Sequence, residues 1–318
     1  MMYELIIIGG GPAAAAGAVY AGRKQIKTLL ITETFGGQSI VSDDIQNWIG
    51  SRSISGIELA KNFEEHIRAQ ETVEVISGDL VEKIDKQGEL PAGHLEVTTK
   101  QGKSYQTKTI FLATGSRRRR LGIPGEDKLD GKGVVFCSTC DAPIFKNKDV
   151  VVVGGGNAGL EAVVDLIPYA NSIKLLIRST ELKGDAITQE KIKNHPKVEV
   201  VFEAVTKEIT GETFVDGVKY LDLKTNEEKT LPVQGVFIEI GSVPNADFLA
   251  NLVERNQRNE VVVNHKTQAT TALGIWAAGD VTDVLYKQNN ISAGDAVKAL
   301  LSIYEFLHKN NITGAHNL

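Results

Sequence analysis

Cysteine is scarce in this sequence. The 318 residues include only two cysteines, Cys137 and Cys140. A scaffold stapled by disulfides needs more of them, and a chain of this length does not need such cross-links to fold. A structural zinc site needs four ligands, and the sequence has no second Cys-x-x-Cys and no closely paired histidines. We therefore interpret the pair as redox-active.

Positive charge is also in deficit. The net charge is -5 at pH 7, which argues against nucleic acid, whose phosphates attract a basic face. The stretch from Leu5 to Gly22 carries no charge, but Gly9-Gly10-Gly11-Pro12 would interrupt a membrane-spanning helix there. The only charged residue before this stretch is Glu4, and the Lys or Arg that begins a signal peptide is missing, so a signal peptide is not indicated. We expect a cytoplasmic protein without a membrane anchor.

Glycine, by contrast, is abundant and gathers in short turns, within a loose internal repeat. The apolar run 3–8 ends in Gly9-Gly10-Gly11-Pro12-Ala13-Ala14, and an alanine-rich segment and a second apolar run, 27–32, follow. The same order returns as 149–153, the turn 154–159, a helix to about Ile167 and the strand 174–178. The pattern predicts strand, glycine turn, helix and strand twice. The runs do not alternate, as expected for parallel strands buried on both faces.

This glycine spacing is typical of phosphate binding. The first glycine makes the tight turn, the second lets the backbone approach a pyrophosphate, and a small third residue allows close helix–strand packing. The N-terminus of the helix then offers free N–H groups and a positive dipole end. The three positions are Gly9, Gly11 and Ala14 in the first copy, and Gly154, Gly156 and Gly159 in the second. We predict two nucleotide sites.

The residue at the end of the second strand of each copy indicates which nucleotide fits. Glu33 lies 24 positions after Gly9 and can accept the hydroxyls of an adenosine ribose. Arg178 lies 24 positions after Gly154 and can pair with a ribose 2′-phosphate, although a solvated strand end is the alternative. Matching the strands by their Leu-Leu-Ile runs would shift this correspondence by one residue.

An ordered set of motifs resembles the low-molecular-weight thioredoxin reductases over the whole chain. The chain is at least as similar to the C-terminal flavoprotein part of the alkyl hydroperoxide reductase reductase subunit. The residues that carry the resemblance are Gly9-Gly10-Gly11-Pro12-Ala13, Phe35-Gly36-Gly37-Gln38, Asn47, Ala113-Thr114-Gly115, Pro124-Gly125-Glu126, Cys137-Ser138-Thr139-Cys140-Asp141, Gly154-Gly155-Gly156-Asn157, Ile240-Gly241, Pro244-Asn245, Ala278-Gly279-Asp280 and Tyr286-Lys287-Gln288.

The resemblance implies an α/β fold with two Rossmann-like nucleotide-binding domains and a homodimer. The FAD domain would be split into 1–116 and 246–318, with an NAD(P)H domain, 117–245, inserted between its parts. The residues expected to bind FAD are Gly9, Gly11, Pro12, Ala13, Glu33, Gly37, Gln38, Asn47, Thr114, Gly115, Gly279, Asp280 and Gln288. A helix from about Ser292 would point its N-terminus at the flavin. The residues expected to bind the nicotinamide nucleotide are Gly154, Gly156, Asn157, Gly159, Arg178 and Lys183.

The resemblance also assigns roles to the redox pair. Cys140 would face the flavin, Cys137 would attack a protein disulfide, and Asp141 would exchange a proton with the leaving thiolate. The plainer interpretation of Asp141 is a helix N-cap before Ala142-Pro143. Related thioredoxin reductases bind the 2′-phosphate through a longer set of cations, of which Arg178 and Lys183 remain here, so we predict NADPH as the preferred nucleotide, with NADH as the alternative.

Three functions remain open at this stage. The first is a thioredoxin reductase that acts on thioredoxin or a similar small disulfide protein. The second is the reductase of a peroxiredoxin system, which would need its N-terminal disulfide module as a separate protein, because this sequence begins directly with the first strand. The third is an electron-transfer module whose cysteine pair is structural. The run Arg117 to Arg120 is a solvated linker, a partner-docking site or a phosphate contact.

Overall fold

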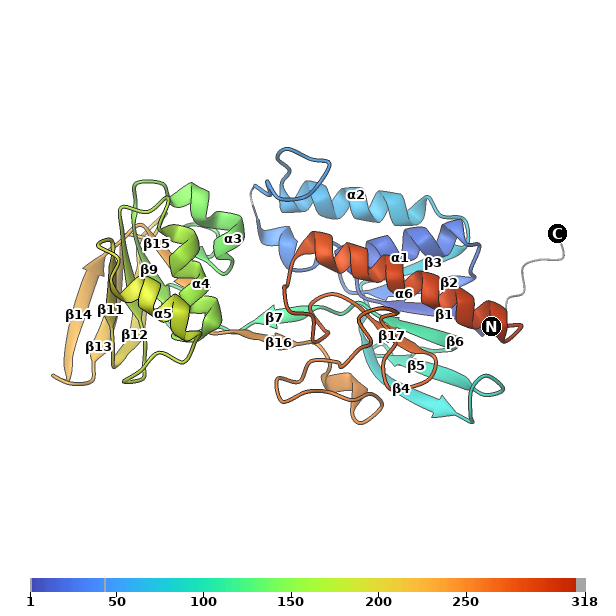
Figure 1. Ribbon diagram of the computed structural model, residues 1–318. Helices are drawn as coiled ribbons and strands as arrows, with labels where there is room; N and C mark the ends of the chain where they lie inside the picture. Colours follow the sequence, from blue (N-terminus) through green and yellow to red (C-terminus); the bar gives the residue numbers. More distant parts are fainter. Residues whose placement is uncertain (1, 43, 313–318) are drawn as a thin grey trace. The chain divides into compact units, whose positions relative to one another are not determined.

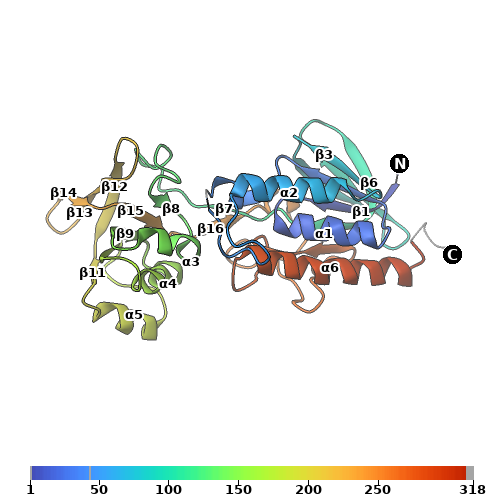
Figure 2. The ribbon, with the colours of Figure 1, turned by 90° about the horizontal axis from the view of Figure 1, so that it is seen from above.

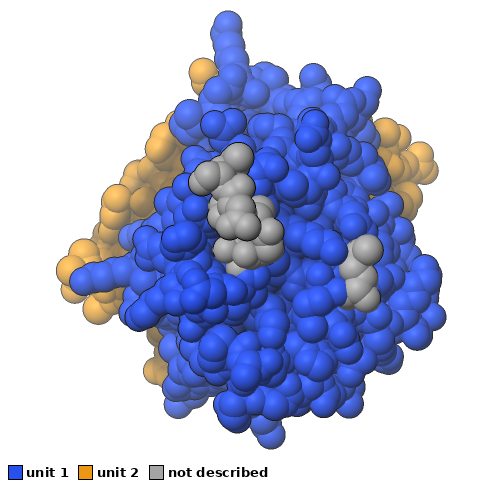
Figure 3. Space-filling view, turned by 90° about the vertical axis from the view of Figure 1, so that its right-hand side faces the viewer, with its two compact units in different colours: residues 1–117, 243–318 blue, residues 118–242 orange. Residues whose placement is uncertain are grey.

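The computed structural model describes residues 2–42 and 44–312 and divides them into two compact units. Unit 1 comprises residues up to Arg117 together with those from Val243 onward, and unit 2 is Arg118–Ser242 (Figure 3). The chain passes between the units next to a two-stranded sheet formed by β7 (Ser116–Arg118) and β16 (Ser242–Pro244).

Unit 1 is built on a seven-stranded sheet whose continuous path runs β3-β2-β1-β6-β5-β4, with β17 paired to β6. Its strands are β1 (Met2–Ile8), β2 (Thr28–Thr32), β3 (Val73–Ser77), β4 (Val81–Gln87), β5 (His94–Thr99), β6 (Ser104–Leu112) and β17 (Ile275–Ala277). The strands β3, β2, β1, β6 and β17 are parallel neighbours, whereas β4, β5 and β6 form an antiparallel meander.

Helices cover one face of this sheet. They are α1 (Pro12–Arg23), α2 (Gly56–Arg68) and α6 (Asn289–Lys309), and both ribbon views place them on the same side (Figures 1 and 2). Leu5 and Ile7 pack into the core beneath the helices, and Ile6 and Ile8 pack into a second core on the other face. Burial on both faces explains why β1 is apolar without alternation. Two short 3₁₀ helices, Gly37–Val41 and Asp247–Leu249, complete the unit.

Unit 2 is built on a parallel sheet of order β11-β10-β9-β15-β8. Its strands are β8 (Val134–Val135), β9 (Asp149–Val153), β10 (Ser172–Leu176), β11 (Val198–Val201) and β15 (Gly235–Ile238). The helices are α3 (Ser138–Asp141), α4 (Asn157–Leu166) and α5 (Ala186–Lys193), with a 3₁₀ turn at Ala142–Phe145. A three-stranded antiparallel sheet of β12 (Ala204–Thr210), β13 (Gly217–Asp222) and β14 (Glu227–Pro232) packs on the other face of the parallel sheet.

The α/β class and the two strand–glycine turn–helix–strand repeats are confirmed. The uncharged stretch Leu5 to Gly22 forms the end of β1, the turn and most of α1. No helix in residues 2–42 and 44–312 is both long and apolar enough to cross a membrane. One predicted boundary was wrong: α6 begins at Asn289 rather than near Ser292. The side chains of Asn289 and Asn290 bond to Ser39 and to the Asn47 carbonyl, which secures this first turn.

Candidate functional site

The first glycine of each repeat adopts the same unusual backbone conformation, with a positive φ. Gly9 has φ 128° and Gly154 has φ 137°, a region that side-chain-bearing residues rarely adopt. A Cβ atom on Gly9 would lie 2.2 Å from the Ala113 carbonyl oxygen, and one on Gly154 would lie 2.2 Å from the Glu239 carbonyl oxygen. Each turn therefore lies directly against the end of a neighbouring strand, and no other residue fits.

The third glycine of each run is the N-cap of the following helix and leaves open space in front of it. Gly11 precedes α1 and Gly156 precedes α4, both with extended backbone, and neither helix has an acidic residue in its first turn. A Cβ atom on Gly156 would meet nothing within 4 Å, and one on Gly11 would meet only Gly37, at 3.8 Å. Open space before free helical N–H groups without a repelling carboxylate suits a phosphate.

Glu33 and Arg178 occupy equivalent places in the two units. The Gly9 amide donates to the Ile31 carbonyl, and the Gly154 amide donates to the Leu176 carbonyl. Ile31 therefore corresponds to Leu176, and Glu33, two residues on, corresponds to Arg178. The hydrogen bonds overturn the alignment by Leu-Leu-Ile runs, which placed the two one residue apart. Both side chains are exposed at the strand ends.

Lys183 and Asn157 lie at the second glycine turn. The Lys183 amide donates to the Gly155 carbonyl at 2.8 Å, and the Asn157 side chain accepts from the Asp185 amide at 2.8 Å. A Cβ atom on Gly159 would lie 1.9 Å from the Gly154 carbonyl oxygen, so α4 approaches the turn closely. Among the residues that the structure describes, no ion pair involves Arg178 or Lys183.

The side chains predicted to surround a flavin come together in unit 1. The Gln38 amide donates to Asp280 at 3.4 Å, and the Asn47 amide donates to Gln288 at 3.4 Å. Two of the predicted glycines lie beside the first glycine loop. A Cβ atom on Gly37 would be 3.3 Å from the Gly11 Cα atom, and one on Gly279 would be 3.4 Å from the Ala13 Cβ atom. Pro12 begins α1 at the same place.

Thr114 and Gly115 follow β6 and are bound to Asn245. The Thr114 hydroxyl donates to the Asn245 carbonyl at 2.8 Å, and the Asn245 side-chain amide donates back to the Thr114 carbonyl at 2.9 Å. The Asn245 backbone amide donates to the Gly115 carbonyl at 3.0 Å. Asn245 thus links the two chain segments of unit 1 close to the points where the chain enters and leaves unit 2.

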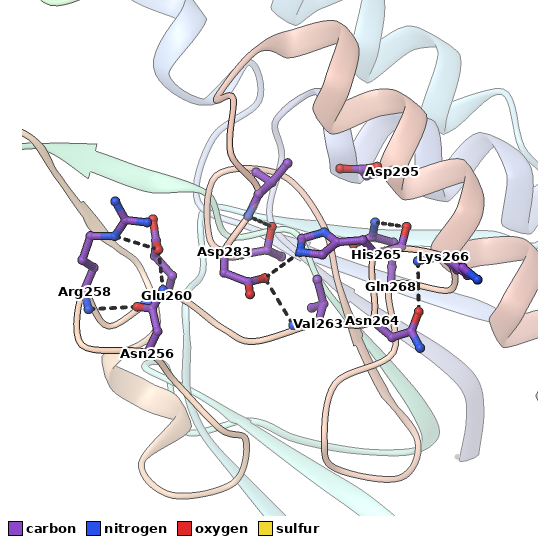
Figure 4. A network of polar contacts seen from close by, with 12 residues as sticks. Asn256, Arg258, Glu260, Val263, Asn264, His265, Lys266, Gln268, Asp283 and Asp295 are labelled. Carbon is purple, nitrogen blue, oxygen red and sulfur yellow. Dashed lines mark hydrogen bonds and ion pairs between the residues drawn. The ribbon is translucent and has the colours of Figure 1, made fainter. Parts of the chain in front are cut away.

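A polar network surrounds Glu260, and Figure 4 shows its contacts with Asn256 and Arg258. The buried Glu260 carboxylate accepts hydrogen bonds from Asn256 at 2.6 Å and Arg258 at 3.1 Å, and it pairs with Lys287 at 3.2 Å. Burial raises the pKa of Glu260, but these partners outweigh burial and lower it. Lys287 also donates to the Asp280 carbonyl at 3.3 Å, so this motif lysine holds the turn beside the predicted site.

Unit 2 carries the Cys137–Cys140 disulfide, whose Cα atoms are 5.4 Å apart. Cys137 is half-buried after β8, and Cys140 is exposed in α3. The two residues between the cysteines are held from α4, because the Asp165 carboxylate accepts from the Ser138 hydroxyl at 2.8 Å and from the Thr139 hydroxyl at 3.2 Å. The segment Cys137–Cys140, called the redox loop from here on, is therefore bound to α4, the helix that follows the second glycine turn.

Asp141 directly follows Cys140 and is the last residue of α3. It precedes the 3₁₀ turn Ala142–Phe145, but its side chain makes no capping hydrogen bond, which counts against the N-cap interpretation. Burial raises the pKa of Asp141 to about 6, although the charge of Arg118 opposes the rise. A carboxyl group with such a pKa is matched to acid–base chemistry near neutrality.

Sequence reasoning missed three side chains around the disulfide: Arg118, Asp165 and Glu239. Arg118 belongs to the arginine run, but it is half-buried and its charge acts on Asp141 and Glu239, which a solvated linker would not do. Asp165 lies eight positions after Asn157, so the helical period puts both on one face of α4. Glu239 directly follows β15 and carried no motif signal.

Comparison with known proteins places these features in a family. Residues 3–299 match the pyridine nucleotide-disulphide oxidoreductase family. Thioredoxin reductase from Streptococcus pyogenes has a similar structure, with a TM-score of 0.88 and 32% identity, over 97% of this chain and 99% of that one. Thioredoxin reductase from Giardia duodenalis, at 27% identity, also has a TM-score of 0.88, over 96% of this chain and 99% of its own.

Curated relatives carry other names. A protein named NADH dehydrogenase from Bacillus subtilis is 40% identical over 308 residues, which is 97% of this chain and 59% of that protein. The F subunit of alkyl hydroperoxide reductase in Staphylococcus epidermidis is 39% identical over 308 residues, or 97% of this chain and 60% of its own. The chain thus spans about six-tenths of the length of these relatives. With its two glycine turns, its disulfide and the match over residues 3–299, the chain belongs to the pyridine nucleotide-disulphide oxidoreductase family.

Proposed function

We propose that this chain is a flavin-dependent disulfide oxidoreductase that passes electrons from NADPH through FAD and the Cys137–Cys140 disulfide to a small protein disulfide such as that of thioredoxin. The observation that carries the proposal is a disulfide beside a carboxyl group of raised pKa, in a unit that also has a glycine turn open to a phosphate. The family implies FAD and a nicotinamide nucleotide.

The residues present suit both nucleotides. Open space at the capping glycines Gly11 and Gly156 leaves room for a pyrophosphate at α1 and α4. We assign FAD to unit 1, with Glu33 on its ribose and with Gln38, Asn47, Asp280 and Gln288 toward the flavin. We assign the nicotinamide nucleotide to unit 2. When bound, the flavin supplies two-electron transfer between the nicotinamide and the disulfide.

The side chains of unit 2 carry out the thiol chemistry in this proposal. In the reduced pair, the Cys137 thiolate attacks a sulfur of the partner's disulfide and forms a mixed disulfide. Asp141 gives its proton to the partner thiolate that leaves. The Cys140 thiolate then attacks Cys137, which restores the Cys137–Cys140 bond and releases the second partner sulfur. Asp165 positions the loop by its bonds to Ser138 and Thr139.

The preference for NADPH rests on Arg178 and Lys183. Both are exposed at the second glycine turn, and Arg178 stands where Glu33 stands in the other unit. A guanidinium there attracts a 2′-phosphate, whereas a carboxylate would repel it. The Bacillus subtilis relative is named for NADH, which makes NADH the competing choice.

A peroxiredoxin system is the second candidate for the partner. The observation that favours it is the 39% identity to the F subunit of alkyl hydroperoxide reductase. Purified protein with FAD should be assayed with NADPH and with NADH against thioredoxin, a glutaredoxin-like protein and a peroxiredoxin. Fastest turnover of thioredoxin with NADPH is expected. Protein that takes up no flavin, or that reduces none of the three disulfides, would refute the proposal.

The homodimer remains a prediction from the family resemblance, and the cytoplasmic location remains a prediction from the sequence itself. Sedimentation of the FAD-bound protein tests the first, because a homodimer has twice the 34.4 kDa of the chain. Cell fractionation tests the second.

A further inference from the structure

Glu239 directly follows β15, between the disulfide and the second glycine turn. On one side β15 pairs with β8, with Phe237 opposite Val135, the last residue of β8. Glu239 and Cys137 each lie two residues beyond this last pair, at the same edge of the sheet. On the other side β15 pairs with β9, with Ile238 opposite Val153, which brings Glu239 opposite Gly154. The Glu239 amide donates to the Val153 carbonyl at 2.9 Å, so the pairing extends to this residue.

The internal repeat shows that the fold does not need a carboxylate there. The carbonyl that lies against Gly154 belongs to Glu239, and the carbonyl that lies against Gly9 in unit 1 belongs to Ala113. Two of the three following residues agree, since Gly115-Ser116 of unit 1 matches Gly241-Ser242 of the second repeat. Gly115 and Gly241 both have positive φ. Unit 1 thus fills the position with a methyl group, and unit 2 places a carboxyl group there.

Charged groups from three elements surround the Glu239 carboxyl. Burial raises its pKa to about 7, and Arg118 of β7 and the Ser138 amide of α3 oppose the rise. The carboxylates of Asp165 on α4 and Asp141 on α3 add to it. A half-buried acid is costly for a fold, and nothing in the strand pairing uses this side chain. The Ser138 amide belongs to the redox loop itself.

We propose that Glu239 is a positioning residue of the redox centre, whose charge is linked to the thiols that are released when the Cys137–Cys140 disulfide is reduced. Reduction takes two electrons, breaks the S–S bond and gives two sulfur groups that bind protons. An ionised Glu239, held by the Ser138 amide next to Cys137, disfavours the Cys137 thiolate, and a thiolate in turn disfavours ionised Glu239. The thiol therefore gains reactivity when Glu239 is neutral. This inference deepens the proposed function and uses it only for the source of the electrons.

The test uses the whole protein, reduced chemically with dithiothreitol and freed of the reductant. Alkylation of Cys137 by iodoacetamide is followed from pH 5 to pH 9 by mass spectrometry of its peptide. Glu239→Gln keeps the shape and the hydrogen-bond acceptor but removes the charge. We expect the thiol of this variant to titrate at lower pH, and its alkylation below the thiol pKa to be about three- to tenfold faster than in the wild type.

Two further variants make the test decisive. Glu239→Ala installs the residue of the unit 1 repeat and should show the same shift, so the test does not depend on one variant folding. Glu208→Gln removes a carboxylate of β12 that pairs with Lys219, and its profile should match the wild type. A folded Glu239→Gln or Glu239→Ala protein whose profile matches the wild type, or whose thiol reacts more slowly, would overturn the inference. Because dithiothreitol replaces the nucleotides, failure of the proposed electron source would leave this result intact.

Discussion

The two units have the same backbone geometry at their glycine turns but carry different side chains around them. Both place a glycine of positive φ against a strand end, with 2.2 Å between a hypothetical Cβ atom and a carbonyl oxygen. They differ at the residue that provides that carbonyl, Ala113 against Glu239, and at the strand end, Glu33 against Arg178. Backbone geometry thus accounts for the glycines, whereas the difference in chemistry between the units depends on the side chains at the strand ends.

The largest effect is expected from the cysteines, which only unit 2 carries. Cys137→Ser and Cys140→Ser should each abolish reduction of a protein disulfide, because two thiols are needed to close the cycle, while FAD binding in unit 1 remains. In Cys140→Ser the surviving Cys137 should trap the partner as a mixed disulfide, visible on a non-reducing gel. Trapping by Cys137→Ser instead would show that the roles of the cysteines are exchanged.

The glycine turns separate the two nucleotides. Gly9→Ala should lose most bound FAD, whereas Gly154→Ala should keep FAD and raise the KM for the nicotinamide nucleotide at least tenfold. Either change forces a backbone shift and a strained φ and should destabilise its unit by about 1–3 kcal/mol. Gly156→Ala is the matched control, since its Cβ meets nothing within 4 Å: it should weaken nucleotide binding without lowering the Tm. Equal FAD loss in Gly9→Ala and Gly154→Ala would refute the assignment of units.

Asp141→Asn tests proton exchange. The wild type should lose turnover as pH rises through about 6, because Asp141 then loses its proton, and the variant should be about a hundredfold slower and lack this step. The raised pKa also means that the folded state binds more protons than the unfolded one. Stability relative to Asp141→Asn should therefore fall by about 2 kcal/mol between pH 4 and pH 6. Identical pH profiles of turnover and melting would refute the role.

The strand ends should decide nucleotide choice. Arg178→Ala should cost about ten- to a hundredfold in preference for NADPH over NADH, because a charge-assisted contact contributes about 1.5–3 kcal/mol. Lys183→Ala should cost less, since its flexible side chain makes a looser contact. The ratio of kcat/KM values measures both. A wild type that prefers NADH, or an Arg178→Ala variant with an unchanged ratio, would contradict the assignment.

The smallest effects should come from Asp165 and from Ser138, which donates to it. Asp165→Asn keeps an oxygen that can accept from Ser138 or Thr139 but weakens both bonds, so turnover should fall about threefold, with nucleotide KM values unchanged. Ser138→Ala removes one of these bonds and should show a smaller loss. A rise in the KM for the nicotinamide nucleotide without a loss of kcat would mean that Asp165 serves the glycine turn and not the redox loop.

The repeats, the glycine turns and the disulfide could be predicted from the sequence, because each depends on residues that are close together in the chain. A positive φ requires glycine, and a Cys-x-x-Cys spacing brings two sulfurs together. Arg118, Asp165 and Glu239 could not be predicted in the same way. Their role depends on the tertiary fold: for Glu239, strand order puts β15 between β9 and β8, so that Glu239 and Cys137 follow neighbouring strands at the same edge of the sheet. For Glu239, which belongs to no motif, the signal in the sequence was its comparison with Ala113 across the repeat.

The most direct test of the account is a count of thiols. Oxidised, FAD-bound protein is mixed with excess NADPH without oxygen or a partner, then denatured and alkylated. We expect two alkylated cysteines per chain, Cys137 and Cys140, and none in the sample without nucleotide. A disulfide that stays intact while the bound flavin is reduced would contradict the central claim that the electrons pass through this pair.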